Sequence, residues 1–272
     1  YNIKIQRVYF LDEAHRSYDP SGSFLANLIA SDRDAVKIAL TGTPIIGEHD
    51  EYDIDDKKLR SVKFNSTAIF GDYIHRYFYN WSIKDGYTLR LIREGIKTEY
   101  REKIKAVLDN LNEIEVLKKG DRKAKEAVYA NAAYVEAMVS YITDDFKSSR
   151  IRMNDESIGG MIVCDSSKQA RAVFEELKKE KYSDLKSQLI LCDEDDKETR
   201  ENYRDAFKSG EIDLLIVFNM LLTGFDAPRL KKMYVGRLIR SHNLLQALTR
   251  VNRPYRDFHY GYVVDFADIR DE

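Results

Sequence analysis

Residues 159–192, GGMIVCDSSKQARAVFEELKKEKYSDLKSQLILC, decide the fold class of this 272-residue chain. Two short apolar runs, Met161 to Cys164 and Gln188 to Cys192, flank a segment with helical spacing near Ser167 to Lys181. Apolar runs without alternation indicate strands that are buried on both faces, which is typical of a parallel sheet. Strand-helix-strand repeats of this length form right-handed βαβ units. The stretch therefore predicts an open α/β domain.

The same rhythm continues toward the carboxyl end of the chain, where apolar runs again alternate with segments of helical spacing. We expect three further strands and two further helices, at Leu214 to Phe218, Met233 to Val235, Tyr262 to Val264, Lys197 to Ser209 and Asn243 to Val251. Residues 151–272 are thus predicted to form one complete α/β domain.

The front of the chain shows a thinner version of the pattern. Val8 to Leu11 and Ile38 to Leu40 are strand-like, and a helix is expected between them near Gly22 to Ala30. Residues 97–146 have helical spacing with no strand-like run. We therefore expect a partial α/β domain over residues 1–95 and a helical connector over residues 96–150.

Composition sets limits on the kind of protein. The formal net charge is −2 with 33% charged residues, so any contact with nucleic acid would need a local basic patch. No stretch approaches the roughly 20 apolar residues of a membrane span, so we expect no membrane contact. The two cysteines, Cys164 and Cys192, each close an apolar run, which indicates buried, reduced thiols and a cytoplasmic protein.

An acidic pair follows the first strand-like run, in the sequence Leu-Asp-Glu-Ala-His-Arg of residues 11–16. Asp12 is suited to hold the Mg²⁺ of Mg·ATP, usually through water. Glu13 is suited to orient and deprotonate an attacking water, which requires a carboxylate within hydrogen-bond reach. Acidic pairs at strand ends are common, so the pair is weighed together with three motifs that follow it in order.

Residues 41–44, Thr-Gly-Thr-Pro, follow the second strand. Pro44 cannot donate to a strand ladder, so the strand ends here and leaves the hydroxyls of Thr41 and Thr43 near its carboxyl edge, where open α/β sheets bind ligands. An ordinary strand-terminating turn is the alternative. The turn lies one βαβ unit after the acidic pair, and this position favours a role in which the turn couples the nucleotide state to a bound nucleic-acid strand.

Residues 219–228, Asn-Met-Leu-Leu-Thr-Gly-Phe-Asp-Ala-Pro, follow the strand at residues 214–218. Gly224 permits an unusual backbone angle or a close approach to a phosphate. Thr223 can donate to a nucleic-acid phosphate, and Asp226 can accept from a ribose hydroxyl or hold an arginine. A generic strand-to-helix loop is the alternative.

The last motif is Gln-Ala-Leu-Thr-Arg-Val-Asn-Arg, residues 246–253. Positions i, i+4 and i+7 share a helix face, so Gln246, Arg250 and Arg253 are expected to project together. Two guanidinium groups and an amide on one face suit a triphosphate, because arginine forks match phosphate oxygens and stabilise charge on the γ-phosphoryl group. Solvent-facing arginines on an amphipathic helix are the alternative.

In this order the four motifs resemble motifs II, III, V and VI of superfamily-two helicases and translocases, and Met-Ile-Val-Cys-Asp-Ser-Ser at residues 161–167 resembles motif IV. The wording Leu-Leu-Thr-Gly-Phe-Asp-Ala-Pro, followed by Leu-Leu-Gln-Ala-Leu-Thr-Arg-Val-Asn-Arg-Pro, is similar to the motor (R) subunit of type I restriction-modification enzymes. The resemblance implies RecA-like parallel sheets of the P-loop NTPase type, with one partial and one complete lobe. It also implies ATP and Mg²⁺ as cofactors.

The activity implied by this resemblance is ATP-dependent translocation along double-stranded DNA, in a complex with methyltransferase and specificity subunits. Catalytic roles fall on Asp12, Glu13, Arg250 and Arg253. Nucleotide binding and coupling to DNA fall on a further set of residues, which comprises His15, Gly224, Asp226 and Gln246 for the nucleotide and Thr41, Thr43 and Thr223 for coupling.

The sequence departs from the family pattern in one respect: it contains no Gly-x-x-x-x-Gly-Lys-Ser/Thr, the loop that cradles phosphates. We therefore expect these 272 residues to be inactive alone and to represent part of a longer protein. The alternatives are another superfamily-two DNA helicase or remodeller, and a non-catalytic fragment that serves DNA binding or assembly.

Overall fold

The computed structural model describes residues 6–14, 27–28, 30–42, 66–110, 122–191, 196–218, 225–236 and 247–266. The chain divides after Tyr77 into two compact units, residues 1–77 and residues 78–272.

The first unit contains a parallel pair of strands, β1 (Val8–Leu11) and β2 (Val36–Ala39), and the short helix α2 (Ser66–Phe70). The strands pair in register from Val8 with Val36 to Leu11 with Ala39. Their residues alternate between exposed and half-buried along β1. The expectation of two neighbouring strands in this part of the chain is confirmed; only residues 27–28 and 30 of the helix expected between them are described.

The second unit is built on a six-stranded sheet in which all five strand pairings are parallel. The strand order is β3-β8-β7-β4-β6-β5. The strands are β3 (Arg90–Gly95), β4 (Gly159–Val163), β5 (Ser187–Ile190), β6 (Leu214–Val217), β7 (Leu230–Val235) and β8 (Tyr260–Asp265). The five strands expected after residue 150 are all present, so the predicted parallel α/β class is confirmed.

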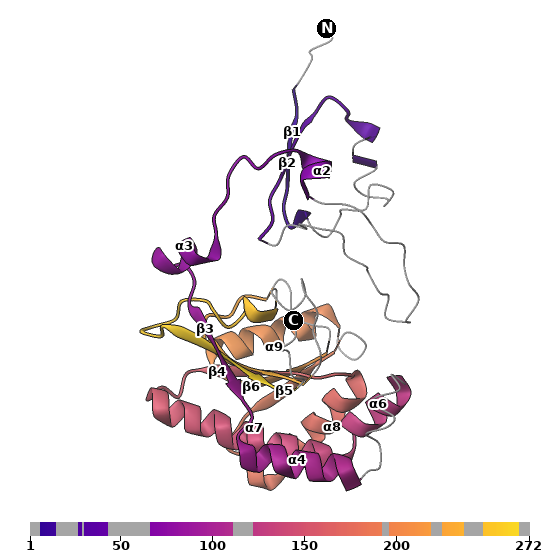
Figure 1. Ribbon diagram of the computed structural model, residues 1–272, viewed down its shortest axis with the longest axis vertical. Helices are drawn as coiled ribbons and strands as arrows, with labels where there is room; N and C mark the ends of the chain where they lie inside the picture. Colours follow the sequence, from indigo (N-terminus) through magenta and orange to yellow (C-terminus); the bar gives the residue numbers. More distant parts are fainter. Residues whose placement is uncertain are drawn as a thin grey trace. The chain divides into compact units, whose positions relative to one another are not determined.

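Helices cover both faces of this sheet, with α4, α6, α7 and α8 on one face and α9 on the other (Figure 1). The helical elements of the unit are α3 (Tyr79–Lys84), α4 (Thr98–Asn110), α6 (Arg122–Tyr129), α7 (Ala132–Met153), α8 (Ser167–Leu177), the 3₁₀ turn η2 (Glu180–Tyr182) and α9 (Lys197–Ser209). Polar side chains start three of these helices: Asn131, Ser166 and Asp196 each accept a hydrogen bond from a first-turn amide. Helix α9 covers the range expected for it, and α8 ends four residues earlier than expected.

Alternate residues of the central strands enter two separate cores, one on each face of the sheet. On β4, Ile162 belongs to the core under α7 and α8, whereas Met161 and Val163 belong to the core under α9. All five β4 residues are buried. This explains why the strands read as continuous apolar runs, since both of their faces are covered. Cys164, at the end of β4, is buried and reduced as expected, and burial raises the pKa of its thiol.

The division of the chain differs from the expected boundaries at residues 95 and 150. Strand β3, within the range assigned to the first domain, pairs with β8 at the edge of the second sheet. Helices α4 and α7, within the range assigned to a connector, pack on the same sheet and contribute Ile104, Tyr134 and Phe146 to its core. The strand was missed because an edge strand needs few apolar residues, and charged side chains interrupt the run in β3.

Candidate functional site

In the first unit the acidic pair lies in a turn at the carboxyl end of β1 that is hydrogen-bonded to the residue after β2. The amide of Ala14 donates to the carbonyl of Leu40 at 3.0 Å, and the amide of Leu40 donates to the carbonyl of Leu11 at 2.9 Å. Between these bonds Asp12 and Glu13 are exposed, whereas Ala14 is buried. The two hydrogen bonds therefore place the acidic pair beside the start of the Thr-Gly-Thr-Pro turn.

The backbone of the acidic pair is in an uncommon conformation. Glu13 has a φ of +49°, in the left-handed region that costs a non-glycine residue roughly 1–2 kcal/mol. Its amide donates to Oδ1 of Asp12 at 2.9 Å, a local bond that supports the turn. Thr41 follows Leu40 directly and is half-buried. Thr41 thus lies one residue beyond the backbone position that is hydrogen-bonded to the acidic turn, while the roles of Asp12, Glu13 and Thr41 remain predictions.

In the second unit the last two motifs contact one another. Nη1 of Arg250 donates to the carbonyl oxygen of Phe225 at 2.9 Å. Nε of Arg253 lies 3.6 Å from Oδ1 of Asp226, and both of these side chains are largely exposed. Of the two roles considered for Asp226, the structure places it against an arginine. Burial of the apolar neighbours Ala227, Ala247 and Val251 in the core under α9 anchors both segments.

The expected helix face over residues 246–253 requires a correction. Within the described residues 247–253, only 247–248 are helical; residues 249–251 form turns, and Arg253 lies beyond them. Arg250 and Arg253 therefore do not project from one continuous helix. The physical reason is Pro254, because the ring of a proline disfavours helical backbone at the residue before it. Arg256, two residues later, has a φ of +46°, which continues the irregular path.

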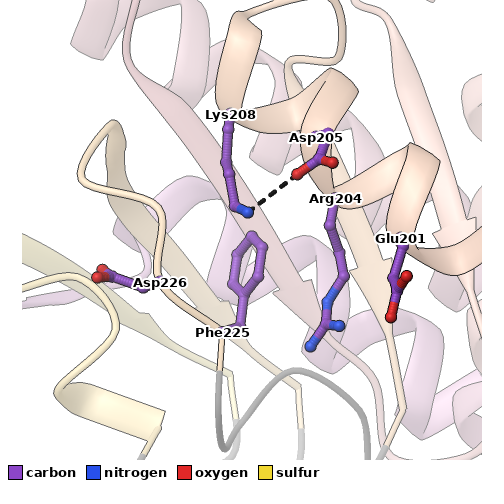
Figure 2. Close-up of a pocket in the computed structure, with 6 residues that line it drawn as sticks. All are labelled: Glu201, Arg204, Asp205, Lys208, Phe225 and Asp226. Atoms are coloured by element: carbon purple, nitrogen blue, oxygen red, sulfur yellow. Dashed lines mark hydrogen bonds and ion pairs between the residues drawn. The ribbon is translucent and has the colours of Figure 1, made fainter.

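A pocket of about 340 Å³ lies between α9 and the segment that begins at Phe225. Figure 2 shows Lys208 and Arg204 of α9 extending alongside the Phe225 ring, with Glu201 farther from the ring and Asp226 on the side opposite Arg204. The lining residues are Glu201, Arg204, Asp205, Lys208, Phe225 and Asp226. Among the described residues, Nε of Arg204 is buried and has no hydrogen-bond partner, and its guanidinium carbon lies 6.0 Å from the centre of the Phe225 ring. Sequence analysis missed Arg204 because nothing in the helical spacing of residues 197–209 separates it from an ordinary exposed arginine.

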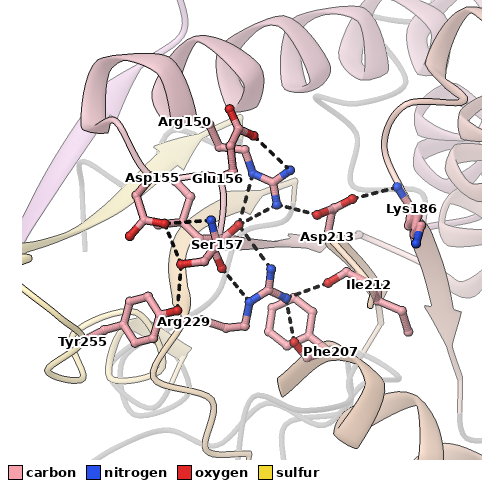
Figure 3. A network of polar contacts seen from close by, with 11 residues as sticks. Arg150, Asp155, Glu156, Ser157, Lys186, Phe207, Ile212, Asp213, Arg229 and Tyr255 are labelled. Atoms are coloured by element: carbon pink, nitrogen blue, oxygen red, sulfur yellow. Dashed lines mark hydrogen bonds and ion pairs between the residues drawn. The ribbon is translucent and has the colours of Figure 1, made fainter. Parts of the chain in front are cut away.

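A polar network supports the loops beneath this site (Figure 3). The Arg229 guanidinium donates to the carbonyls of Ser157 at 2.7 Å and of Phe207 and Ile212 at 2.6 Å. Burial lowers the pKa of Arg229. Nη2 of Arg150 donates to the carbonyl of Ile158 at 2.8 Å. These buried guanidinium groups satisfy backbone carbonyls that lie outside the sheet ladders, so their role is structural.

The same network reaches the segment after Arg253. The hydroxyls of Tyr255 and Ser157 lie 2.8 Å apart, and the Arg256 guanidinium pairs with Asp155 at 2.8 Å. Burial acts to raise the pKa of the Asp155 carboxyl, but hydrogen bonds from Ser157 and Arg256 outweigh burial and lower it. The loop before β4 and the loop before β8 are therefore joined by charge-assisted hydrogen bonds.

Five of the predicted nucleotide-binding and coupling residues lie outside the described part of the chain, namely His15, Thr43, Thr223, Gly224 and Gln246, as does Cys192.

Among the described residues, no group of three or more His, Cys, Asp or Glu side chains is placed to hold a metal ion. Mg²⁺ that arrives with a nucleotide needs few protein ligands, because phosphates and water supply the others. The exposed carboxylate of Asp12 fits that requirement as a single oxygen ligand.

None of the described helices is long and apolar enough to cross a membrane.

Comparison with protein families gives two matches that together cover most of the chain. Residues 167–268 match the family described as type I restriction enzyme subunit R domain 3, and residues 2–126 match the SWI2/SNF2 ATPase family. The MjaIXP endonuclease subunit, assigned to a type I restriction enzyme of Methanocaldococcus jannaschii, is 29% identical over 287 residues, covering 97% of this chain. The chain spans 26% of the length of that relative.

Two solved structures resemble the chain as a whole. The ATP-dependent Type ISP restriction-modification enzyme LlaBIII, bound to DNA, has a TM-score of 0.58 and 12% identity, covering 96% of this chain and 18% of that one. The Mycobacterium smegmatis helicase Lhr, bound to ssDNA and AMP-PNP, has a TM-score of 0.55 and 15% identity, covering 97% and 29%. At these identities the likeness shows the fold, which is that of the RecA-like domains of superfamily-two helicases.

Proposed function

From the relationship of this chain to the endonuclease (R) subunits of type I restriction enzymes, we propose that it is the motor part of such a subunit and belongs to an ATP-dependent double-stranded DNA translocase. The observation that supports this most directly is the hydrogen bonding at the end of β1. The hydrogen bond from the amide of Ala14 to the carbonyl of Leu40 joins the acidic pair to the start of the Thr-Gly-Thr-Pro turn. The candidate catalytic carboxylates and the start of the candidate coupling turn therefore lie at the same edge of the sheet.

The proposed chemistry assigns distinct duties to the two carboxylates. Asp12 would hold Mg²⁺, and Mg·ATP when bound supplies the phosphoryl group that is transferred and the charge that offsets its oxygens. Glu13 would accept the proton of the attacking water, which requires a carboxylate within hydrogen-bond reach of that water. The left-handed backbone of Glu13 supports this duty, because strained residues in folded proteins cluster at functional sites. Thr41, beside the pair, would pass the nucleotide state to the bound DNA.

The second unit would supply cationic groups. Arg250 donates to the carbonyl of Phe225, and Arg253 lies near the carboxylate of Asp226, so both guanidinium groups lie beside the segment that begins at Phe225. Of the two, Arg253 is the stronger candidate to reach a γ-phosphoryl group, because its side chain is 45% exposed. Groups of this kind are worth roughly 10³ to 10⁵ in rate.

Partners follow from the same proposal. Double-stranded DNA would be gripped through its phosphates, since a pump must ignore sequence. Methyltransferase and specificity subunits would supply modification and site recognition. A cytoplasmic location follows from a DNA substrate. Because the chain spans about a quarter of its archaeal relative, these activities belong to the longer protein, and the 272 residues alone, without a Gly-x-x-x-x-Gly-Lys-Ser/Thr loop, should hydrolyse no ATP.

The proposal is tested by Asp12→Asn and Glu13→Gln in an assembled restriction enzyme whose R subunit contains this sequence. Both variants should lose DNA-stimulated ATP hydrolysis and keep DNA binding, because neither carboxylate is proposed to touch DNA. Asp34→Asn, an exposed carboxylate in the same unit, is the matched control and should keep full activity. Wild-type ATP hydrolysis by the double variant would refute the assignment.

A strand-separating helicase is the second candidate, favoured by the likeness to the Lhr fold. The two differ in what they do to DNA during ATP hydrolysis. A translocase should displace a third strand from a triplex placed ahead of it without separating the duplex, whereas a helicase should release a labelled strand from the duplex itself.

A further inference from the structure

Residues 247–256, here called the arginine segment, are irregular in backbone yet held at several points. The amide of Leu89, just before β3, donates to the carbonyl of Asn252 at 2.6 Å. The carbonyl of Val251 faces Gly261 of β8 so closely that a Cβ on that glycine would lie 2.1 Å from it. The segment is thus held by the sheet as well as by its own turn hydrogen bonds, from the amide of Arg250 to the carbonyl of Ala247 at 3.0 Å and from the amide of Val251 to the carbonyl of Leu248 at 3.3 Å.

Lys231 of β7 makes a third contact with this segment. The side chain is fully buried, and its ammonium group donates to the backbone carbonyl of Arg253. The Tyr255 ring lies 5.9 Å from Nζ. Among the residues that the structure describes, no carboxylate forms an ion pair with Lys231, and its hydrogen-bond partner is that carbonyl.

The neighbouring Lys232 shows that this environment is unusual. Lys232 is also fully buried, but its ammonium group pairs with Asp145 at 2.8 Å and with Glu94, and donates to Ser149 at 3.1 Å. Buried lysines are almost always paired in this way, because an unpaired buried charge is costly. Burial of Lys231 against a carbonyl alone is therefore a cost that a methionine of similar length would avoid, and it calls for a function.

We infer that Lys231 is a positioning residue for Arg253, with its ammonium group fixing the carbonyl, and hence the backbone turn, from which the Arg253 side chain projects. This inference rests on the proposed role of Arg253 in ATP hydrolysis. The geometry suits it, because the contact is made at the backbone of Arg253 itself, immediately before Pro254. Lys231 would touch neither nucleotide nor DNA.

The charge of Lys231 adds a measurable signature. Burial lowers its pKa to about 8, and no charged group among the described residues offsets that effect. The protonated form makes the stronger, charge-assisted bond. Turnover that depends on this bond should therefore fall as the pH rises through about 8.

The experiment compares Lys231→Met, Arg253→Ala and Tyr234→Phe in the assembled enzyme, with ATP turnover, nucleotide KM and unfolding temperature measured for each. Tyr234→Phe is the matched control, since it removes one buried hydrogen bond, to Asp145 at 2.8 Å, from the same strand on the opposite face. Lys231→Met should lower kcat by roughly 10- to 100-fold, because a 1 Å misplacement of a reacting group costs about 10²-fold. Its KM should stay within about twofold, and Tyr234→Phe should keep its kcat.

Lys231→Arg provides a second variant that retains both donor and charge, since arginine stays protonated. It should keep its turnover at pH 9, where the wild type declines. An inactive Arg253→Ala together with wild-type kcat in Lys231→Met would overturn the inference and leave the proposed function standing. Full activity in Arg253→Ala would instead overturn the role of the arginine itself. An unchanged pH decline in Lys231→Arg would also overturn the inference.

Discussion

Replacement of Gly261 by alanine in β8 should destabilise the second unit far more than the same change at Gly95 in the neighbouring edge strand β3. The added Cβ would meet the carbonyl oxygen of Val251 at 2.1 Å and its carbonyl carbon at 2.7 Å. A carbon normally approaches a carbonyl oxygen to about 3.3–3.6 Å, so strand or segment must move by roughly 1.2 Å. Neither β8 nor the arginine segment can move easily, because the contact involves the backbone carbonyl of Val251 and because β8 is paired with β3 and β7.

The expected cost follows from this geometry. Overpacking of a well-packed site costs about 1–3 kcal/mol, and a clash between two backbone segments belongs at the upper end. For a unit of this size, about 3 kcal/mol lowers the unfolding temperature by roughly 6–12 °C. Unfolding of the purified chain would be followed by calorimetry, with Gly95→Ala as the matched control.

Gly95 ends the adjacent strand β3, and a Cβ there would meet no atom within 4 Å. Its replacement by alanine should leave stability unchanged or raise it by up to about 1 kcal/mol, through the unfolded chain. Equal unfolding temperatures for the two variants would refute the reasoning, because they would show that the arginine segment does not press on β8.

Four further outcomes are expected from the burial pattern and the polar contacts. Hydrogen exchange should protect the amides of Leu214–Val217, buried throughout, far longer than those of Val8–Leu11, which alternate with exposed positions; equal protection would show that the first unit is complete in itself. Arg229→Met should lower the free energy of unfolding by about 3 kcal/mol or more, because it leaves buried carbonyls without donors, and urea titration measures this. Asn154 caps α7 in a left-handed conformation, so Asn154→Ala should cost about 1 kcal/mol and Asn154→Gly almost nothing. Asp155 has a lowered pKa, so the stability lost in Asp155→Asn should be largest above the ordinary pKa of 3.8 and vanish as the pH falls through the lower folded value; a loss that persists at pH 2 would contradict this.

The parallel α/β class was predictable because it depends on a local property. A strand covered on both faces must be apolar at nearly every position, and the runs at β4 and β6 show this without reference to any other part of the chain. The position of the acidic pair was equally predictable, since Asp12 and Glu13 directly follow a strand-like run. Strand β3 was not, because an edge strand with exposed charges has no such signature.

The arrangement of the arginines depended on contacts that no local pattern records. Helical periodicity predicted a shared face for Arg250 and Arg253. Pro254 and two hydrogen bonds set a different path: the amide of Leu89 donates to the carbonyl of Asn252, and the ammonium group of Lys231 donates to the carbonyl of Arg253. The sequence by itself determined which strands are buried and where the acidic pair lies along the chain. Tertiary structure decided the path of the segment that carries Arg253, because that path depends on hydrogen bonds from Lys231 of β7 and from Leu89, which is far from the segment in the chain.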